Sequence, residues 1–373
     1  MWLKSLFLSN FRNFKRLDIR FCSRLNLFWG DNREGKTNLL EAIHCLGHGI
    51  SHRTNSEGEL IKWKEEGLYL RGEGIKSERL FTYEFFLSRK NPKVRRVDSH
   101  RVNFRDPTKW LWMVTFSPED IWLVRGSPVG RRNFLDAKLP LFNPRYSYLR
   151  FSYRRILSQR NYLLSLARKG KQGDEHLESW DEQLVDLGSA IVKLRLEGLE
   201  KLESFFKEIY PRVIGRDCKV NLVYQSSFLK NAASSLPIEE IKNAFCKELA
   251  LKRAKEMELR ITLVGPHRDD FFILVDGIDL RSFGSRGEQR IAALSLKLAE
   301  LGLVKLKEGD YPVSLLDDIT SELDSRRQRL LLNLVQNQSQ VFLTTTQPSL
   351  FESSLSKDAY LYQVKTNQVR KQG

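Results

Sequence analysis

The residues with the clearest capacity for chemistry are residues 30–37, with the sequence Gly-Asp-Asn-Arg-Glu-Gly-Lys-Thr. Two glycines five positions apart, followed by Lys and Thr, fit the pattern of a loop that binds nucleotide phosphates. In such a loop backbone N–H groups surround one anion, Lys36 reaches the β- and γ-phosphates, and the Thr37 hydroxyl holds Mg²⁺. The predicted nucleotide-binding residues are Gly30, Asp31, Asn32, Arg33, Glu34, Gly35, Lys36, Thr37 and Asn38.

The sequence on both sides of this loop supports the prediction. Residues 25–29 alternate as a short strand would, and residues 38–43 have helical spacing without a breaker. A strand, a glycine loop and a helix start together favour a bound anion, because the helix dipole adds to the N–H groups. An ordinary glycine turn accounts for the loop but not for this context.

Two carboxylates far along the chain could complete the site. Asp317 and Asp318 follow the apolar run 313–316, which indicates a buried strand. Asp317 could reach a metal held by Thr37, and Asp318 suits orienting or deprotonating an attacking water. Their distance from Lys36 implies that a sizeable insertion interrupts one nucleotide-binding core.

A second anion site is predicted at residues 283–290, Phe-Gly-Ser-Arg-Gly-Glu-Gln-Arg, just before a long amphipathic segment. Ser285 and Gly287 lie where that helix should begin, and helix N-termini bind anions. Residues 320–324 occupy a turn that could touch a neighbouring subunit. One chain then carries two phosphate-binding helix termini.

The elements that must position these residues follow from hydrophobic periodicity. Helices are expected over residues 237–257, 286–305 and 325–335, and the pattern becomes helical from Pro118 onward. Leu177, Leu184 and Ile191 form a short heptad seam, which predicts an antiparallel helical hairpin interrupted at Gly198 and ended by Pro211. The tail from Thr366 is expected to fray. Strands are expected over residues 2–8, 17–21, 25–29, 219–224, 259–264, 271–275, 313–316 and 341–345, with a β-meander over 68–104.

Charge points to a polyanionic partner. The net charge of +16 favours nucleic acid first and an anionic membrane second, against the alternative of a generally basic surface. Residues 137–173 contain no acidic residue, and Arg150, Arg154 and Arg155 lie within them; the tip of the meander holds Arg95 and Arg96. These arginines are the candidate DNA contacts. The aromatics among them suit core anchors better than base-stacking platforms.

Other features restrict the class of protein. The length predicts about two domains. No apolar run is long enough to cross a bilayer and no signal peptide is evident, so a cytoplasmic protein is expected. The four cysteines form no C-x-x-C pair and are expected to be reduced. His44, His48 and His52 recur every four residues, but metal binding is disfavoured because no carboxylate or thiol completes a ligand set.

The order of these motifs resembles an ABC-type ATPase head, and within that class the chain is similar to the RecF family of bacterial recombination mediators. The resemblance is collinear and covers nearly the whole chain. It rests on residues 8–13 (Leu-Ser-Asn-Phe-Arg-Asn), 38–43, 116–120 (Phe-Ser-Pro-Glu-Asp), 126–128, 131–136 (Arg-Arg-Asn-Phe-Leu-Asp), 265–270 (Gly-Pro-His-Arg-Asp-Asp), 315–318 and 321–324.

This resemblance implies a weak, DNA-stimulated ATPase that uses ATP and Mg²⁺, dimerises around ATP and binds single-stranded and duplex DNA. With RecO and RecR it would help to load RecA at gaps during repair, replication restart and the SOS response. The family's site residues imply that Arg12 contacts phosphate and that Thr346 senses the γ-phosphate. The signature that caps the partner's ATP would be Ser285, Gly287 and Glu288, and the turn at the dimer interface would contain Ser321 and Asp324.

The chain departs from the pattern at three points. Arg33 and Glu34 replace the Gly-Gln usual inside the loop, which predicts altered affinity but not lost binding. Arg286 stands where the wider class has a second signature glycine. Asp318 replaces the longer Glu of the wider class, in keeping with slow hydrolysis.

The expected fold is α/β: an ABC-type head with a P-loop core and mixed β-sheet, plus an inserted, mostly helical domain with a short antiparallel coiled-coil-like hairpin. The domains would be residues 1–117, 118–257 and 258–373, the last holding the signature, Asp317 and the interface turn. Two alternatives stay open: an SMC-like head acting in another DNA transaction, and a non-hydrolysing DNA clamp switched by ATP. Membrane binding lacks a basic amphipathic anchor.

Overall fold

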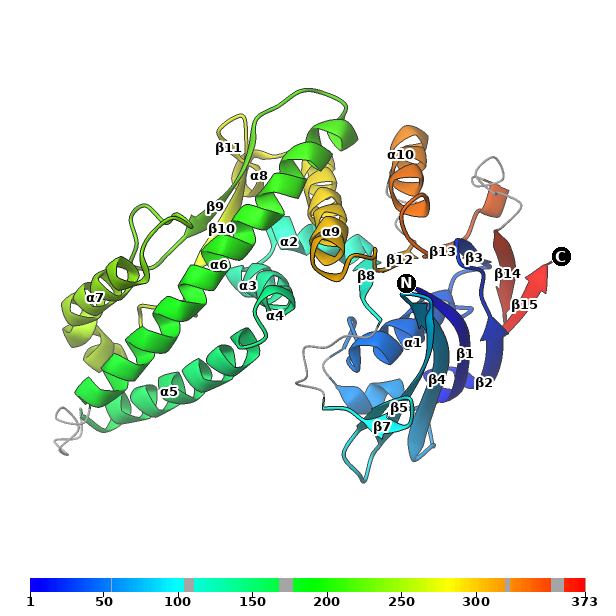
Figure 1. Cartoon of the computed structure of the whole chain (residues 1–373), viewed down its shortest axis with the longest axis horizontal. Coiled ribbons are helices and arrows are strands. Elements are labelled where there is room, and N and C mark those ends of the chain that lie inside the picture. The colour runs from blue at the N-terminus through cyan, green and yellow to red at the C-terminus, as the bar shows by residue number, and fades with distance from the viewer. Residues whose placement is uncertain (55, 104–110, 168–176, 319–322, 350–358, 373) are drawn as a thin grey trace. The chain divides into compact units, whose positions relative to one another are not determined.

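The computed structural model covers the whole chain and describes all residues except 55, 104–110, 168–176, 319–322, 350–358 and 373 (Figure 1). The chain divides into two compact units. Unit 1 comprises residues 1–120 and 300–373, and unit 2 comprises residues 121–299. Within the described residues, no helix is long and apolar enough to span a membrane.

The central sheet of unit 1 is a mostly parallel sheet in the order β15-β14-β3-β13-β12-β8. Every residue of β12 and β13 is buried, as the uninterrupted apolar runs of a parallel sheet require. The carboxyl ends of β3, β12 and β13 lie at one edge, where the nucleotide loop, Asp317 and the end of β13 meet. The strands are β3 (Leu25–Trp29), β8 (Met113–Phe116), β12 (Val313–Asp317), β13 (Val341–Thr345), β14 (Tyr360–Lys365) and β15 (Gln368–Gln372).

A second, antiparallel sheet of unit 1 has the order β2-β1-β4-β5-β6-β7. Helix α1 (Lys36–His48) shares one apolar core with both sheets, through residues such as Leu6, Leu39 and Phe342. A short 3-10 helix, η1 (Glu57–Leu60), precedes the meander. The strands are β1 (Trp2–Phe11), β2 (Phe14–Arg20), β4 (Gly67–Lys76), β5 (Arg79–Ser88), β6 (Val94–Val97) and β7 (His100–Arg101).

Unit 2 is mostly helical, with α6 packed against both α5 and α7 (Figure 1). Its three-stranded sheet has the order β11-β10-β9. Helix α9 (Arg286–Glu308) begins in unit 2, and α10 (Ser325–Gln336) belongs to unit 1. The other elements of unit 2 are α2 (Trp122–Arg125), α3 (Pro128–Asp136), α4 (Leu139–Phe142), α5 (Tyr146–Ala167), α6 (Leu177–Ile214), β9 (Val220–Gln225), α7 (Ile238–Leu259), β10 (Asp270–Val275), β11 (Ile278–Asp279) and α8 (Leu280–Phe283), and a 3-10 turn, η2 (Pro118–Ile121), precedes α2.

The hairpin prediction was wrong about where the long helix stops. Helix α6 continues through Gly198 and Pro211 to Ile214. A side chain at Gly198 would collide with Leu139, so this glycine permits close packing of α4 and does not break the helix. Pro211 lies in the last turn, and its carbonyl still accepts a hydrogen bond from the Gly215 N–H at 2.9 Å.

Two further predictions of local structure were wrong. Residues 259–264 form no strand: α7 runs to Leu259 and ends at Arg260, which has a left-handed φ of 61°. The C-terminal tail forms the β14–β15 hairpin, whose turn residues Thr366 and Asn367 both have positive φ. Two such residues make a type I′ turn, which polar residues such as Asn favour.

The predicted domain boundary at residue 258 does not match the division into compact units, which falls after residue 299. The physical reason is the pairing of β9 with β10, in which Tyr224 lies opposite Phe271. This pairing ties the segment after α7 to the helical region. The signature and the first turns of α9 therefore belong to unit 2.

Candidate nucleotide-binding site

The loop between β3 and α1 has the geometry of a phosphate cradle. Gly35 has a φ of 105°, and a Cβ there would lie 2.7 Å from the Asn13 side-chain nitrogen; one at Gly30 would collide with the Val364 carbonyl oxygen. Both positions therefore require glycine. Arg33 takes a φ of 70° and is exposed, so the departure at this position is accommodated in the left-handed region.

Lys36 is buried in this loop. Its ammonium donates hydrogen bonds to the Gly30 carbonyl at 2.7 Å and to the Asp31 carbonyl at 2.8 Å. Burial lowers the pKa of Lys36, although Asp318 and Asp317 act in the opposite direction. The ammonium thus lies at the centre of the loop, bonded to weak acceptors that a phosphate could replace.

Asp317 lies beside the loop although it is 280 positions away from Thr37 in the sequence. Its Oδ1 accepts a hydrogen bond from the Thr37 hydroxyl at 2.9 Å and another from the Thr344 hydroxyl at 2.8 Å. Burial raises the pKa of Asp317, and these two bonds oppose that rise. A hydroxyl and a carboxylate are the oxygen donors that Mg²⁺ prefers, so Thr37 and Asp317 fit this ion.

Asp318 follows with a left-handed φ of 47°. Its backbone N–H donates to the Thr344 hydroxyl at 3.0 Å. Thr344 therefore fixes the backbone of one carboxylate and the side chain of the other. Thr346, the predicted γ-phosphate sensor, is exposed immediately after β13, at the same edge of the sheet.

Arg12 is held by a carboxylate in this structure. Its Nε and Nη2 donate to the two oxygens of Glu41 at 2.9 and 2.8 Å, and its Nη1 donates to the Glu59 carbonyl at 3.0 Å. Burial acts to raise the pKa of Glu41, but hydrogen bonds from Arg12 and Ser51 hold it below its usual value. The contact of Arg12 with phosphate stays a prediction.

The C-terminal hairpin supports the loop, which the sequence analysis missed by expecting a frayed tail. The Glu34 carboxylate accepts a hydrogen bond from the Thr366 N–H, and the Asn13 side chain bonds to that of Asn367. Asn13 in turn accepts a bond from Asn38 at 2.9 Å. The sequence signal for this hairpin was the polar pair Thr366-Asn367 between two runs of strand-like residues, 360–365 and 368–372.

The signature residues lie at the N-terminus of α9. The Ser285 hydroxyl donates to the Glu288 carboxylate at 2.9 Å, and the Ser285 backbone N–H donates to the same oxygen at 3.0 Å. The Glu288 N–H donates back to the Ser285 hydroxyl at 3.3 Å, which completes a capping box. Gly287 is exposed, and the nearest atom to a Cβ at this position would be the Ser285 hydroxyl oxygen, 4.0 Å away.

Of the two predicted interface-turn residues, Ser321 lies outside the described residues. Asp324 caps α10, because its carboxylate accepts a bond from the Arg327 N–H at 2.9 Å. Among the described residues no group of His, Cys, Asp and Glu could hold a metal by itself. His44 instead accepts or donates a hydrogen bond with Thr115 and stacks on His48.

The candidate DNA contacts differ in exposure. Arg154 and Arg155 are exposed on α5, and Arg150 is half-buried, 3.2 Å from Asp136. On β6, Arg96 is exposed while Arg95 is buried, so the tip prediction is corrected to Arg96 alone. The core-anchor interpretation of the aromatics suits Tyr146 and Tyr153, which are buried, but not three that are exposed by half or more: Tyr148, Phe151 and Tyr162.

The model of the family described as RecF/RecN/SMC N terminal domain matches residues 2–371. The DNA replication and repair protein RecF of Halothermothrix orenii is 40% identical over 347 residues, which are 93% of this chain and 92% of that protein. The solved structure of the recombination mediator protein RecF-ATPrS in the RecFOR pathway is 33% identical, with a TM-score of 0.88, and covers 100% of this chain and 98% of its own.

The ABC ATPase fold extends beyond these relatives. An Smc head bound to the C-winged helix domain of ScpA gives a TM-score of 0.57 at 15% identity, over 100% of this chain and 97% of that chain. This likeness confirms the predicted fold class.

Proposed function

This chain belongs to the RecF family of DNA replication and repair proteins, and from that premise we propose that it is an ATP-dependent, DNA-binding recombination mediator. The observation that carries the proposal is the meeting of Lys36, Thr37 and Asp317 at one edge of the central sheet. The solved relatives whose names include ATP support nucleotide binding by this chain.

ATP would enter the loop and replace the Gly30 and Asp31 carbonyls as partners of the Lys36 ammonium. Thr37 and Asp317 would hold Mg²⁺, which supplies charge neutralisation for phosphoryl transfer. Asp318, one residue farther along, would orient the attacking water. Its short side chain is consistent with the slow hydrolysis that we propose.

The γ-phosphate would be shared between two copies of the chain. Ser285 at the start of α9 offers a hydroxyl and a helix N-terminus to the nucleotide of the other copy. ATP would then favour the closed dimer because it makes contacts that separate chains lack. Hydrolysis would remove those contacts and reopen the dimer.

DNA would bind to exposed arginines, with Arg154 and Arg155 of α5 as the first candidates. The net charge of +16 supports an anionic partner. We further propose that the chain acts with RecO and RecR to help load RecA at gapped DNA. The name of the solved relative, which places RecF in the RecFOR pathway, supports this part.

The main test is light scattering with ADP, with ATP, and with ATP in the Lys36→Ala variant. We expect dimers only for the unaltered chain with ATP. Dimers that form equally with ADP, or in the Lys36→Ala variant, would contradict a switch driven by the triphosphate.

A non-hydrolysing clamp remains the alternative from a different class. The position of Asp318 beside Asp317 and Thr344 favours hydrolysis over that alternative. ATP turnover with DNA present is measured for the unaltered chain and for Asp318→Asn. We expect turnover that the substitution lowers; no turnover in either, with ATP still causing dimerisation, would support the clamp.

A further inference from the structure

Two motifs that the ATP-binding account leaves unused meet in unit 2: residues 131–136 and residues 265–270. Arg131 donates to both oxygens of Asp270, at 2.7 and 2.8 Å, in a buried ion pair. Its neighbour Arg132 donates to the Asp269 carbonyl at 2.7 Å. These bonds join α3 to the start of β10 and fix one wall of a pocket of about 160 Å³.

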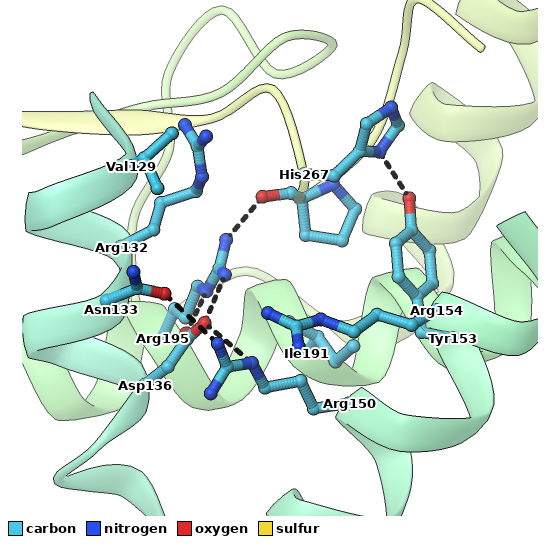
Figure 2. A pocket seen from close by; sticks show the side chains of 11 residues that line it. Val129, Arg132, Asn133, Asp136, Arg150, Tyr153, Arg154, Ile191, Arg195 and His267 are labelled. Carbon is cyan, nitrogen blue, oxygen red and sulfur yellow. Dashed lines mark hydrogen bonds and ion pairs between the residues drawn. The ribbon is translucent and has the colours of Figure 1, made fainter. Parts of the chain in front are cut away.

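The pocket is lined by four arginines from three helices and by one carboxylate (Figure 2). Arg132 comes from α3, Arg150 and Arg154 come from α5, and Arg195 comes from α6. The single carboxylate is that of Asp136. The formal charge of the lining is therefore strongly positive.

Both carboxylate oxygens of Asp136 already have hydrogen-bond or ion-pair partners. Its two oxygens accept from Arg195 at 2.9 and 3.0 Å, one also accepts from the Tyr146 hydroxyl at 2.5 Å, and the other lies 3.2 Å from Arg150. Arg132 and Arg154 form no ion pair with any residue that the structure describes. Arg132 and Arg154 are thus the two arginines of the lining that have no direct ion-pair partner among the described residues.

His267 does not change this balance at neutral pH. Its Nε2 donates to the Thr262 carbonyl at 3.1 Å, so its Nδ1 accepts from the Tyr153 hydroxyl at 2.8 Å (Figure 2). Burial lowers the pKa of His267 to about 4, and the ring is therefore neutral. Burial also lowers the pKa of Arg132, and repulsion from the nearby Arg195 adds to the effect, while Asp270, Asp136 and Asp269 act in the opposite direction. An anion in the pocket would relieve this repulsion.

We propose that this pocket binds one phosphate group of DNA, internal or terminal, between Arg132 and Arg154. Planar guanidinium groups match phosphate oxygens, and the volume lies below the about 300 Å³ at which sites for drug-sized ligands begin. Arg154 also belongs to the basic run of α5, in which the neighbouring Arg155 is exposed but does not line the pocket. The identification of DNA as the source of the phosphate rests on the proposed function, whereas the pocket as a phosphate site does not.

The first arm of the test examines the pocket without DNA. Inorganic phosphate is titrated into the Lys36→Ala protein, whose nucleotide loop is weakened, and thermal unfolding is followed. We expect phosphate to raise the melting temperature, and Arg132→Gln or Arg154→Gln to remove most of that rise. Arg155→Gln, one residue from Arg154 and outside the pocket, serves as the matched control and should keep it. If Arg132→Gln fails to fold, Arg154→Gln still provides the test, because the Arg154 side chain is exposed and its loss should not disturb folding.

The second arm measures affinity for a gapped duplex at several salt concentrations, with and without a 5′-phosphate at the gap. Loss of one charge-assisted contact should lower the affinity about tenfold in Arg132→Gln or Arg154→Gln. The slope of log K against log salt should become less steep by about 0.9, the amount expected for the loss of one phosphate contact. A loss confined to the 5′-phosphorylated duplex identifies a terminal phosphate, and an equal loss in both identifies an internal one.

The outcomes separate the pocket from its source of phosphate. No stabilisation by inorganic phosphate, or equal stabilisation of all variants, overturns the pocket as an anion site. Stabilisation that depends on Arg132 and Arg154, with unchanged DNA affinity, overturns DNA as the source and indicates an acidic group of a protein partner. If the unaltered chain fails to bind DNA, the proposed function fails, while the first arm still decides whether the pocket binds phosphate.

Discussion

Two helix N-termini carry the proposed ATP chemistry, and they are capped in opposite ways. Helix α1 begins after Gly35, which offers no side-chain cap, and the Lys36 ammonium lies in the loop before it. Helix α9 begins after Ser285, and Glu288 of the same helix already fills its N-terminus with a carboxylate. The N-terminus of α1 is therefore open to the phosphate of a ligand, whereas the N-terminus of α9 is already stabilised by the Glu288 carboxylate.

This difference suggests a division of labour. A preformed loop can bind ATP in a single chain, because its N–H groups and Lys36 need only exchange carbonyl partners. At the α9 terminus an incoming phosphate would meet the Glu288 carboxylate, so a contact there requires the capping box to adjust. Binding at α1 should therefore be strong, and the contact at α9 weak and conditional.

The largest effect is expected for Lys36→Ala. Loss of the buried ammonium removes two charge-assisted contacts to phosphate, which should weaken ATP binding on the order of 100-fold or more. Titration of a fluorescent ATP analogue measures this directly. Comparable affinity in the variant would show that α1 is not the primary anion site.

A smaller loss is expected for Thr344→Val, which removes the hydroxyl that bonds to Asp317 and to the Asp318 backbone. Loss of such a supporting contact should weaken Mg²⁺ binding about 10–100-fold. Magnesium dependence of ATP turnover is the measurement. Thr345→Val, the adjacent buried threonine on the same strand, is the control and should change the magnesium requirement little.

Ser285→Ala should leave the α1 terminus intact and weaken only the second one. We expect ATP affinity of the single chain to stay unchanged, and the ATP-dependent dimer to weaken about tenfold. Nucleotide titration and sedimentation on one preparation distinguish the two effects. Equal loss in both would mean that Ser285 supports folding and not the partner's nucleotide.

The smallest effect is expected for Glu288→Gln, which should lower the free energy of unfolding by about 1 kcal/mol through the weakened capping box. Hydrogen bonds from the Ser285 N–H and hydroxyl lower the pKa of Glu288, so this stabilisation is present above the ordinary glutamate pKa. It is lost as the pH falls through the lowered pKa. The difference between the two proteins in denaturant unfolding should begin to shrink as the pH falls below the ordinary glutamate pKa of about 4.3; a difference that stays constant down to pH 3 would argue against the ionised cap.

The sequence was most informative where chemistry and local structure coincide. Gly30, Lys36 and Thr37 are close together in the chain, so one motif predicted both the loop and its ligand. Asp317 was predicted from an apolar run that the structure buries completely. Both predictions needed only short sequence patterns and the general rule that the strands of a parallel sheet are buried on both faces.

Features that depend on tertiary packing were missed. Gly198 appeared to be a helix breaker, but its missing side chain makes room for Leu139. The burial of Arg95 and the role of the 366–367 turn beside Glu34 likewise depend on segments distant in sequence. The pocket around Arg132 and Arg154 requires three helices and the 265–270 segment to be placed together, which periodicity cannot predict.

The most direct test of the shared triphosphate mixes two variants that are each defective in dimerisation. Lys36→Ala lacks the loop contact, and Ser285→Arg blocks the signature contact with a bulky side chain. In a mixed dimer one nucleotide site carries both defects, while the other combines an intact Lys36 with an intact Ser285 from the partner. We predict that ATP produces dimers from the mixture at a level that neither variant reaches alone. Absence of mixed dimers, when the unaltered chain dimerises with ATP, would contradict the account.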